Sequence, residues 1–441
     1  MVMVHLFRIF MIFSVAAFAG IGCSHSPENT VIQDKEEPAQ EKVVLIFWDS
    51  NAGPRRTPYY EELIKRFEEK HPEIDVKYVG IPNQSNLQKY EAAIASNDTP
   101  DVAEVYPSWL SGFTARGALL PLDEHFEQWS EKDKINKDAI QFNREVVGDG
   151  KLYGIPNTQN LDVFWYRQDW YRQKKVQPPV TWDEFFYAVK SMTDKANRRY
   201  GYSIRGGKGG SFQLQRLMYS YSGISNYFDE HGKSTINDPR HVQFVKQYFD
   251  IYKSYTPESD IRNSYKEMIT AFDTGAVALI HHNIGSYGEH SQILNPGQFA
   301  AQPLPKAPDG KYVVEAGNTN GYSIFKNTKH PNEAWKLLSF LCSAEAQSYW
   351  NEKIGQIPTH MDAVKDPWVK RTQHIQTALQ VLENPQTVYY YPPFYLPDYR
   401  SILDNQVDPG IQDVMSGKKT VEDFLNEWAR AMEKSKQKYE K

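Results

Sequence analysis

Cysteine is almost absent from this chain of 441 residues, which contains only Cys23 and Cys342. Two cysteines are too few for a disulfide framework. Hydrophobic cores must therefore hold the fold together, and an apolar content of 40% is sufficient for them. The length suits two domains, or three by the usual domain size.

Positive charge is not in excess, since the formal net charge at pH 7 is −5. The chain lacks the basic footprint of a nucleic-acid-binding protein, so no nucleic-acid partner is predicted. It also lacks an HExxH motif, a GxSxG motif and a nucleophile with a placed base. The segment 205–210, RGGKGG, lacks the GK[ST] ending of a phosphate loop, and a flexible loop over a cleft is the preferred interpretation. His281-His282 lacks a third metal ligand at suitable spacing, so neither a metal nor a cofactor is predicted.

Long apolar runs are also scarce, and the one from Ile9 to Ile21 is too short to span a bilayer comfortably. It suits the apolar region of a signal peptide, and it ends in a GIGC sequence that resembles a bacterial lipobox. Gly20 departs from the pattern, which prefers Leu, Val or Ile there. The sequence thus predicts a signal peptide over 1–22, lipidation of Cys23 and a flexible tether over 23–42.

Aromatic residues, in contrast, are abundant, with 28 Tyr, 22 Phe and 10 Trp. Core packing accounts for most of them. The surplus of Tyr and Trp is also typical of a carbohydrate cleft, because flat rings match sugar faces and their polar tips form hydrogen bonds.

The stretch 99–123 organises the rest of the chain. Residues 101–106 predict a short buried strand between two prolines, and a helix follows from Pro107. Tyr106, Ser108 and Trp109 therefore stand at the carboxyl end of a strand. In an open α/β sheet, ligands bind at that edge.

An earlier βαβ unit leads to the same edge. Residues 43–48, VVLIFW, predict a buried strand, and Thr57 is the expected start of the helix that precedes the strand at 74–78. Trp48 and Asp49 then lie at the carboxyl end of the first strand. The alternative for Trp48 is a place in the core.

Polar side chains cluster where the chain is expected to pass between domains. Asn157, Asn160 and Asp162 follow one expected strand, and Asn318 and Asn320 accompany a later one. Buried in a core such groups would be costly without partners, whereas beside a polyhydroxylated ligand they supply donors and acceptors. An ordinary polar hinge loop is the alternative.

Several motifs resemble one known family. They are PDV with a following AxGxLxPL at 100–122, LYGIP at 152–156, KHPxxAW at 329–335 and GxxPT at 355–359. Together they resemble the extracellular solute-binding proteins of ABC importers, the sugar-binding family that includes maltose-binding protein. The resemblance runs in order over about residues 43–432.

The resemblance implies an α/β fold of the type II periplasmic-binding-protein kind, with two lobes, a hinge and a ligand cleft between them. The expected lobe 1 comprises 43–155 plus about 280–325. The expected lobe 2 comprises 156–279 plus about 326–441. The Tyr- and Pro-rich segment 388–399, VYYYPPFYLPDY, cannot be helical and either closes the cleft or packs on it.

The resemblance implies a receptor that captures a carbohydrate, expected to be an oligosaccharide, and delivers it to the transmembrane subunits of an ABC permease. The receptor is expected to be extracytoplasmic, lipid-anchored and monomeric, and it is not expected to be an enzyme. Trp48, Tyr106, Trp109 and Tyr287 are the expected stacking residues. The family usually has a Trp where this chain has Tyr287. The full expected ligand set is Trp48, Asp49, Tyr106, Ser108, Trp109, Asn157, Asn160, Asp162, Asn283, Tyr287, Asn318 and Asn320.

Two alternatives stay open at this point. A secreted glycoside hydrolase needs two carboxylates about 5–10 Å apart across a sugar cleft, and no pair stands out. A binding protein for a charged non-sugar solute needs a cluster of carboxylates or arginines, for which Asp49 and Asp162 are the only acidic candidates that can be placed.

Overall fold

A computed structural model describes residues 42–439, and these residues form one compact unit. The predicted signal peptide, the lipidated Cys23 and the tether up to residue 41 lie outside the described residues. Among residues 42–439, no helix is long and apolar enough to cross a membrane.

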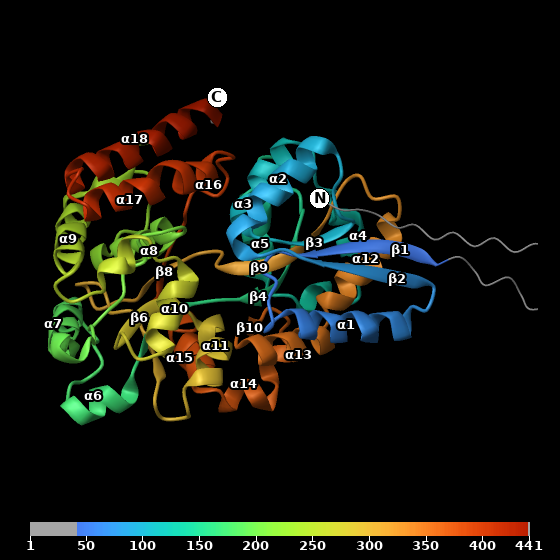
Figure 1. Ribbon diagram of the computed structural model, residues 1–441. Helices are drawn as coiled ribbons and strands as arrows, with labels where there is room; N and C mark the ends of the chain where they lie inside the picture. Colours follow the sequence, from blue (N-terminus) through green and yellow to red (C-terminus); the bar gives the residue numbers. More distant parts are fainter. Residues whose placement is uncertain (1–41, 440–441) are drawn as a thin grey trace, which may run out of the picture. The chain divides into compact units, whose positions relative to one another are not determined.

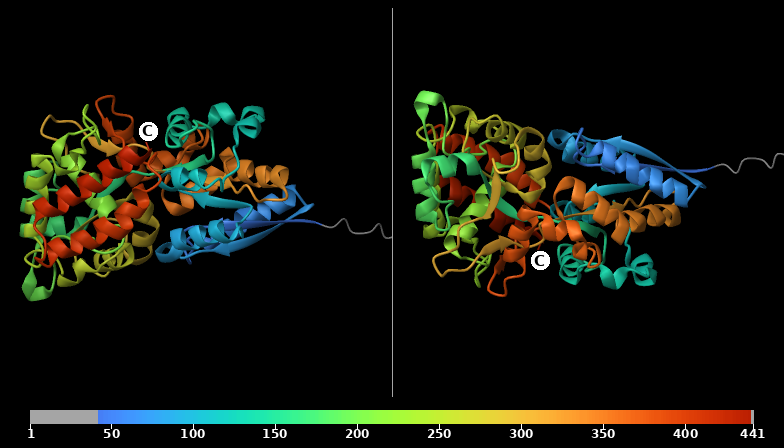
Figure 2. Two further views of the ribbon diagram at one scale, coloured as in Figure 1. Left: turned by 90° about the horizontal axis from the view of Figure 1, so that it is seen from above. Right: turned by 90° about the horizontal axis from the view of Figure 1, so that it is seen from below.

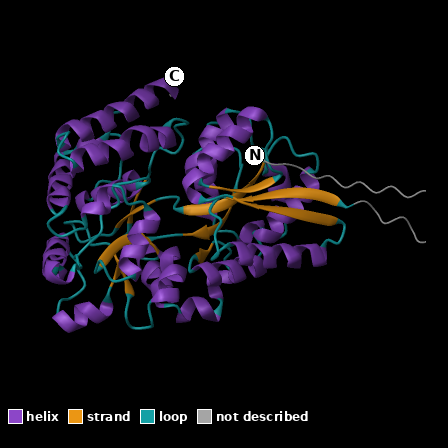
Figure 3. Cartoon of the chain, in the orientation of Figure 1, coloured by secondary structure: helices purple, strands orange, loops and turns teal. Residues whose placement is uncertain are grey.

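A six-stranded mixed sheet forms the centre of lobe 1 (Figure 3). Its spatial order is β10, β4, β9, β3, β1, β2. β1 is parallel to β2 and β3, whereas β3, β9, β4 and β10 pair antiparallel in turn. The strands are β1 (Val43–Asp49), β2 (Ile74–Gly80), β3 (Val102–Val105), β4 (Ile155–Gln159), β9 (Thr319–Ile324) and β10 (Ile357–Pro358).

Helices cover both faces of this sheet, and successive side chains of β1 alternate between them. Phe47 packs with Tyr60 of α1 on one face, while Trp48 packs with Tyr90 of α2 on the other. Figure 1 shows α1 and α13 side by side below the sheet and α2 and α3 above it. The helices of lobe 1 are α1 (Thr57–Lys70), α2 (Asn86–Ser96), α3 (Pro107–Ala115), α4 (Asp123–Gln128), α5 (Lys137–Glu145), α12 (Pro331–Leu341) and α13 (Ala344–Ile354).

Lobe 2 has two smaller sheets and most of the remaining helices. β5 (Asp162–Tyr166) lies between β6 (Leu279–Asn283) and β7 (Ala300–Pro303), antiparallel to both, and β8 (Val313–Glu315) is parallel to β11 (Val388–Tyr390). Its helices are α6 (Gln168–Lys174), α7 (Trp182–Met192), α8 (Gly210–Ser222), α9 (Pro239–Asp250), α10 (Tyr265–Asp273), α11 (Tyr287–Ile293), α14 (Pro367–Arg371), α15 (Gln373–Leu382), α16 (Tyr399–Ile402), α17 (Asp408–Met415) and α18 (Val421–Tyr439).

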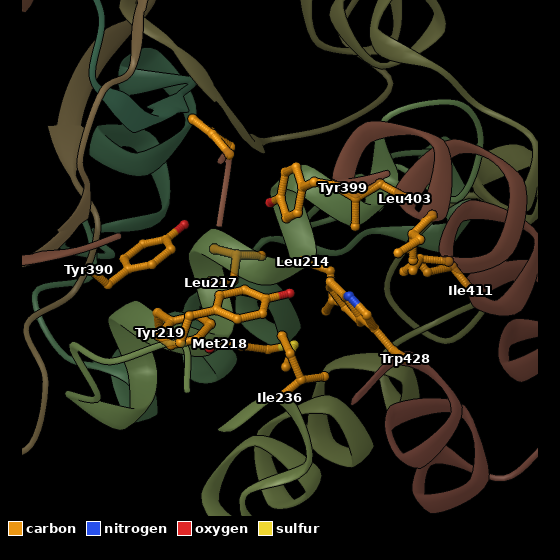
Figure 4. Close-up of a cluster of buried hydrophobic side chains, with 14 of the residues drawn as sticks. Leu214, Leu217, Met218, Tyr219, Ile236, Tyr390, Tyr399, Leu403, Ile411 and Trp428 are labelled. Carbon is orange, nitrogen blue, oxygen red and sulfur yellow. The ribbon is translucent and has the colours of Figure 1, made fainter. Parts of the chain in front are cut away.

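The core of lobe 2 is rich in aromatic side chains (Figure 4). Tyr219 of α8 stacks on Tyr390 with ring centroids 4.4 Å apart, and Trp428 of α18 lies in the same buried cluster. The C-terminal helices α17 and α18, red in Figure 2, lie against each other and cover this core. Tyr390 belongs to the aromatic segment 388–399, which leads to α16. The segment therefore begins inside lobe 2.

That run continues to lobe 1. Phe394 packs edge-on against Phe142 of α5 at 5.9 Å, and the Ser111 hydroxyl donates to the Tyr395 carbonyl oxygen at 2.7 Å. Segment 388–399 therefore packs across both lobes. It is not helical before Tyr399, where α16 begins, as expected from its prolines.

Local signals in the sequence are confirmed at several ends of elements. The sequence TWDE at 181–184 predicts a capping box, and Thr181 and Glu184 form one at the start of α7. Thr420 is predicted to cap the last helix, and its hydroxyl accepts from the Asp423 amide at the start of α18. The sequence also predicts a strand over 200–204. That prediction is wrong, because Tyr200 makes only an isolated bridge and the segment is irregular.

The loop 205–210 also differs from the expected flexible loop. Its glycines pack tightly on neighbouring backbone, and a Cβ atom on Gly206 would lie 2.6 Å from the Asp260 carbonyl oxygen. The glycines therefore permit close approach of the chain rather than free movement.

Two segments pack in the lobe opposite to the expected one. Residues 279–303 contribute β6 and β7 to the sheet of β5, and α12 and α13 pack against β1 and α1. We therefore propose that lobe 1 comprises 43–159, 319–354 and 357–358, and that 162–315 and 367–439 form lobe 2. The reason for the change is strand pairing between distant segments, which local patterns do not contain.

Candidate ligand site between the lobes

A cavity of about 630 Å³ lies between lobe 1 and lobe 2. This volume is in the range of small-molecule sites, about 300–1,000 Å³. Lobe 1 contributes the loop 51–56 after β1 and residues 106–109 after β3, and lobe 2 contributes side chains of α8, α10 and α11. The chain segment 317–320, which returns to lobe 1, completes the wall.

Seven of the twelve predicted ligand residues line this cavity. Three of them directly follow β3, whose carboxyl end lies at a ligand-binding edge of the sheet, and the four asparagines lie after β4, at the end of β6 and at the start of β9. These residues are Tyr106, Ser108, Trp109, Asn160, Asn283, Asn318 and Asn320.

Tyr106 and Trp109 form an aromatic corner at the start of α3. Their rings meet edge-to-face at 4.6 Å. Trp109 also packs on Tyr90 and Phe113 and is only 3% exposed, so it belongs to the core of lobe 1 as well as to the cavity wall. Tyr106 is the more exposed of the two rings.

Trp48 and Asp49 lie elsewhere. Trp48 is 8% exposed and packs on Tyr90 in the core, since its side chain projects to the helix-covered face of β1. The Asp49 carboxylate is buried, where it accepts hydrogen bonds from Arg56 at 3.2 Å and from the Tyr78 hydroxyl at 2.9 Å. Neither side chain lines the cavity.

Asn157, Asp162 and Tyr287 are also absent from the cavity wall. Asn157 is buried and donates to the Tyr322 hydroxyl at 2.9 Å. Asp162 pairs with Arg216 at 3.0 Å, and Tyr287 stacks on His374 at 4.0 Å on the side of α11 away from the cavity. Each side chain is held by a protein partner, which the sequence pattern does not reveal.

An amide network joins the strands where the chain passes between lobes. Gln356 donates to the Asn160 side-chain oxygen at 2.6 Å and accepts from the Thr158 hydroxyl at 3.1 Å. The Asn160 backbone N–H donates to the Asn318 carbonyl oxygen at 2.8 Å. These bonds fix two crossing segments to each other next to the cavity.

Arginines on the cavity wall are the main residues that sequence reasoning missed. Five line the cavity, two from the loop after β1 and three from lobe 2: Arg55, Arg56, Arg205, Arg216 and Arg400. The only sequence signal was the Arg55-Arg56 pair directly after the first strand. The other three are far apart in the chain and meet only through the fold.

Three of these arginines have carboxylate partners. Arg56 lies 2.9 Å from Glu104, Arg216 lies 2.6 Å from Glu315, and Arg400 lies 2.9 Å from Asp404. Burial raises the pKa of Glu104, and Arg56 opposes that shift. Burial would also raise the pKa of Asp162, but Arg216 and the neighbouring His281 and His282 together outweigh it and hold that pKa well below its ordinary range.

Carboxylates on the lobe 2 side are paired as well. Asp273 lies 2.6 Å from His290, and Glu289 accepts a short hydrogen bond from the Tyr265 hydroxyl. Burial raises the pKa of Glu289. His282, which stacks on Tyr265, has its pKa lowered to about 3 by burial and by Arg205. Within residues 42–439, no group of three or more His, Cys, Asp or Glu is arranged to hold a metal ion.

This two-lobed fold with a cavity at its hinge is that of a solute-binding protein. Residues 53–348 match the family described as bacterial extracellular solute-binding protein, which is more than half of the chain. The chain belongs to this family, which confirms the predicted family and fold class.

Named relatives agree with that assignment. The chain is 24% identical over 369 residues to an uncharacterized ABC transporter extracellular-binding protein of Pyrococcus horikoshii, covering 81% of this chain and 80% of the relative. It is 24% identical over 352 residues to the multiple sugar-binding protein of Streptococcus mutans, covering 74% and 77%.

The fold is similar to that of the GacH receptor of Streptomyces glaucescens. That structure superposes with a TM-score of 0.79 at 20% identity and covers 90% of this chain and 99% of its own. At this identity the similarity supports the fold alone.

Proposed function

We propose that this protein captures a carbohydrate in the cavity between its lobes and delivers it to an ABC permease. The observation that carries the proposal is the composition of the cavity wall. Aromatic rings from both lobes, Tyr106 and Trp109 opposite Phe212 and Tyr265, share the wall with the amides of Asn160 and other crossing residues. Rings pack on sugar faces, and amides bind sugar hydroxyls.

Relatives support a sugar as the ligand. The relative from Streptococcus mutans is named as a multiple sugar-binding protein, and the GacH receptor was solved in complex with acarbose. We take the ligand to be an oligosaccharide, since the cavity of about 630 Å³ has aromatic and amide side chains from both lobes.

The proposal includes binding without turnover. A glycosidase needs one carboxylic acid and one carboxylate free to act on opposite sides of the bond. The three carboxylates that line the cavity, Asp273, Glu289 and Glu315, each have a protein partner. Incubating the protein with a bound oligosaccharide for a day should release no product, and product in proportion to protein would favour the hydrolase alternative.

A ring on the cavity wall tests the ligand class. Phe212 is half-buried and lines the cavity from α8. We expect Phe212→Ala to weaken binding of the tightest oligosaccharide in a calorimetric glycan panel by about 30-fold, since losing an aromatic anchor costs about 2 kcal/mol. Tyr187→Ala removes a 65% exposed ring outside the cavity and is the control. Equal affinities in both variants would show that the ligand does not contact Phe212.

Anchoring at the membrane is part of the same proposal. The lipobox-like GIGC sequence motivates lipidation of Cys23, which would place the receptor on the outer side of the membrane as a monomer beside the permease. We expect Cys23→Ser to move the protein from the membrane fraction to the soluble fraction. A variant that stays in the membrane fraction would contradict lipidation.

A further inference from the structure

Arg205 is one of two cavity arginines, with Arg55, that have no carboxylate within ion-pair distance among residues 42–439. Its Nε donates to the Lys208 carbonyl oxygen at 2.8 Å. Among residues 42–439, the two terminal nitrogens of its guanidinium have no hydrogen-bond partner, and no carboxylate lies within ion-pair distance. A planar fork of N–H groups is therefore open on a ligand cavity.

Asp408, the carboxylate with the largest electrostatic effect on Arg205, is used elsewhere. Asp408 accepts from the backbone N–H groups of Gly209 at 2.6 Å and Ser211 at 2.8 Å, so it caps the start of α8. Burial lowers the pKa of Arg205 to about 10, Asp408 opposes this shift, and the cations Arg400 and Arg216 add to it. Arg205 thus lies among other guanidinium groups in a partly buried place.

The two neighbouring arginines, Arg400 and Arg216, both lie against the ring of Phe212. Arg400 lies over the Phe212 ring at 4.7 Å and Arg216 at 6.0 Å. Asp404 binds Arg400 through both carboxylate oxygens, and Asp162 and Glu315 hold Arg216. These carboxylates hold the two side chains, and both arginines act electrostatically on Arg205.

The backbone is shaped to make room for this side chain. Gly209 has a φ of +81°, and a Cβ atom there would lie 2.3 Å from an Arg205 terminal nitrogen. Gly209 also lines the cavity. The loop 205–210 therefore forms a cradle in which the guanidinium reaches the cavity.

We propose that the ligand is an acidic carbohydrate, and that Arg205 binds its carboxylate or sulfate group through paired hydrogen bonds while Phe212 packs on the sugar ring. This inference rests on the proposed carbohydrate function and narrows it. Guanidinium forks match carboxylate and sulfate oxygens, and such charge-assisted pairs are stronger than neutral hydrogen bonds. Arg55 contributes from the opposite wall, since its Nη1 is buried without a partner among the described residues.

The test compares matched pairs of sugars by calorimetry on the purified protein. Oligogalacturonates, alginate oligosaccharides and hyaluronan oligosaccharides are each paired with their carboxyl-reduced products. A carrageenan oligosaccharide is paired with its desulfated product, which distinguishes sulfate from carboxylate as the anionic group. We expect an acidic member to bind at least about 30-fold more tightly than its neutral partner.

Variants of Arg205 test whether this side chain causes the preference for acidic sugars. Arg205→Gln should remove most of the preference for the acidic member, with Arg55 supplying the remainder, and Arg205→Lys, which keeps the charge without the fork, should retain more of the preference. Arg116→Gln, on the surface of lobe 1, is the matched control. Melting curves identify a variant that fails to fold, in which case the paired sugars on the unmodified protein decide the question.

Two results would overturn the inference in different ways. Equal binding of acidic and neutral members, or an acid preference that is undiminished in a folded Arg205→Gln protein, removes the role of Arg205 and leaves carbohydrate capture standing. A protein that binds no member of any pair overturns carbohydrate capture as well.

Discussion

Trp109 occupies two environments at once, and this limits what its substitution can show. One side of the indole lines the cavity, while Tyr90 and Phe113 hold it in the core of lobe 1. Truncation of a buried tryptophan costs about 3–5 kcal/mol of stability. Loss of binding and loss of stability would therefore occur together, whereas Phe212 separates them.

His241 gives a prediction at the scale of one residue. It is fully buried, with Nε2 2.8 Å from the Ser222 hydroxyl and Nδ1 2.9 Å from the Thr235 carbonyl oxygen. Burial lowers its pKa to about 4 in the folded protein, from 6.5. The neutral ring therefore stabilises the fold above pH 6.5, and this contribution is lost as the pH falls toward 4.

The variant His241→Gln should remove that pH dependence. As the pH falls from 6.5 to 5, the free energy of unfolding should fall less steeply in the variant than in the unmodified protein. The two slopes should differ by about 1.4 kcal/mol per pH unit. Urea unfolding at several pH values measures both slopes. His231→Gln, an exposed histidine, should keep the original slope, and parallel slopes for His241→Gln and the unmodified protein would contradict the assignment.

The sequence predicted the cavity residues that follow strands directly, and it missed those that only the packing of distant segments brings together. Tyr106 and Asn160 were predicted because each follows directly from its place at the end of a strand. Arg205, Arg216 and Arg400 come from a loop and two helices, and only packing brings them together. Side-chain direction also cannot be read from spacing alone, and for that reason Trp48 and Asp162 were placed wrongly on the cavity wall.

At the scale of elements, the predictions that held depend on neighbours in the chain. The start of α3 at Pro107 and the capping box of α7 are set by residues within one turn. The assignment of β6, β7, α12 and α13 to lobes depends on distant partners, which explains why the expected lobe bounds differ from the observed packing.

Gly317 tests the element that returns the chain to lobe 1. Its φ is +66°, and a Cβ atom there would lie 1.9 Å from the Phe142 ring of α5. We expect Gly317→Ala to cost about 1–2 kcal/mol for the backbone conformation and a further 1–3 kcal/mol for displacing Phe142.

Denaturant unfolding of a matched variant separates the two costs. Gly297 has a φ of +84° with no atom near the position of a Cβ, so Gly297→Ala carries the backbone cost alone. Equal losses of unfolding free energy in both variants would show that Phe142 moves aside freely.

At the scale of the whole molecule, the lobes contact each other at the rim of the cavity. Lys208, in the cradle loop, donates to the Gln84 carbonyl oxygen of lobe 1 at 2.6 Å. Arg55 and Glu289 carry opposite charges on the two walls, and Arg55 opposes the rise in the pKa of Glu289. Both interactions favour the state in which the lobes enclose a ligand, as hinge closure requires.

Loss of the Lys208 contact should therefore act on the lifetime of the complex. A ligand is retained in proportion to the stability of the closed state, and one hydrogen bond contributes about 1 kcal/mol to it. We expect Lys208→Gln to raise the ligand dissociation rate about fivefold in stopped-flow measurements while the association rate changes little. Lys195→Gln, on an exposed turn of lobe 2, is the control. A change confined to the association rate would mean that Lys208 guides ligand entry and does not hold the lobes together.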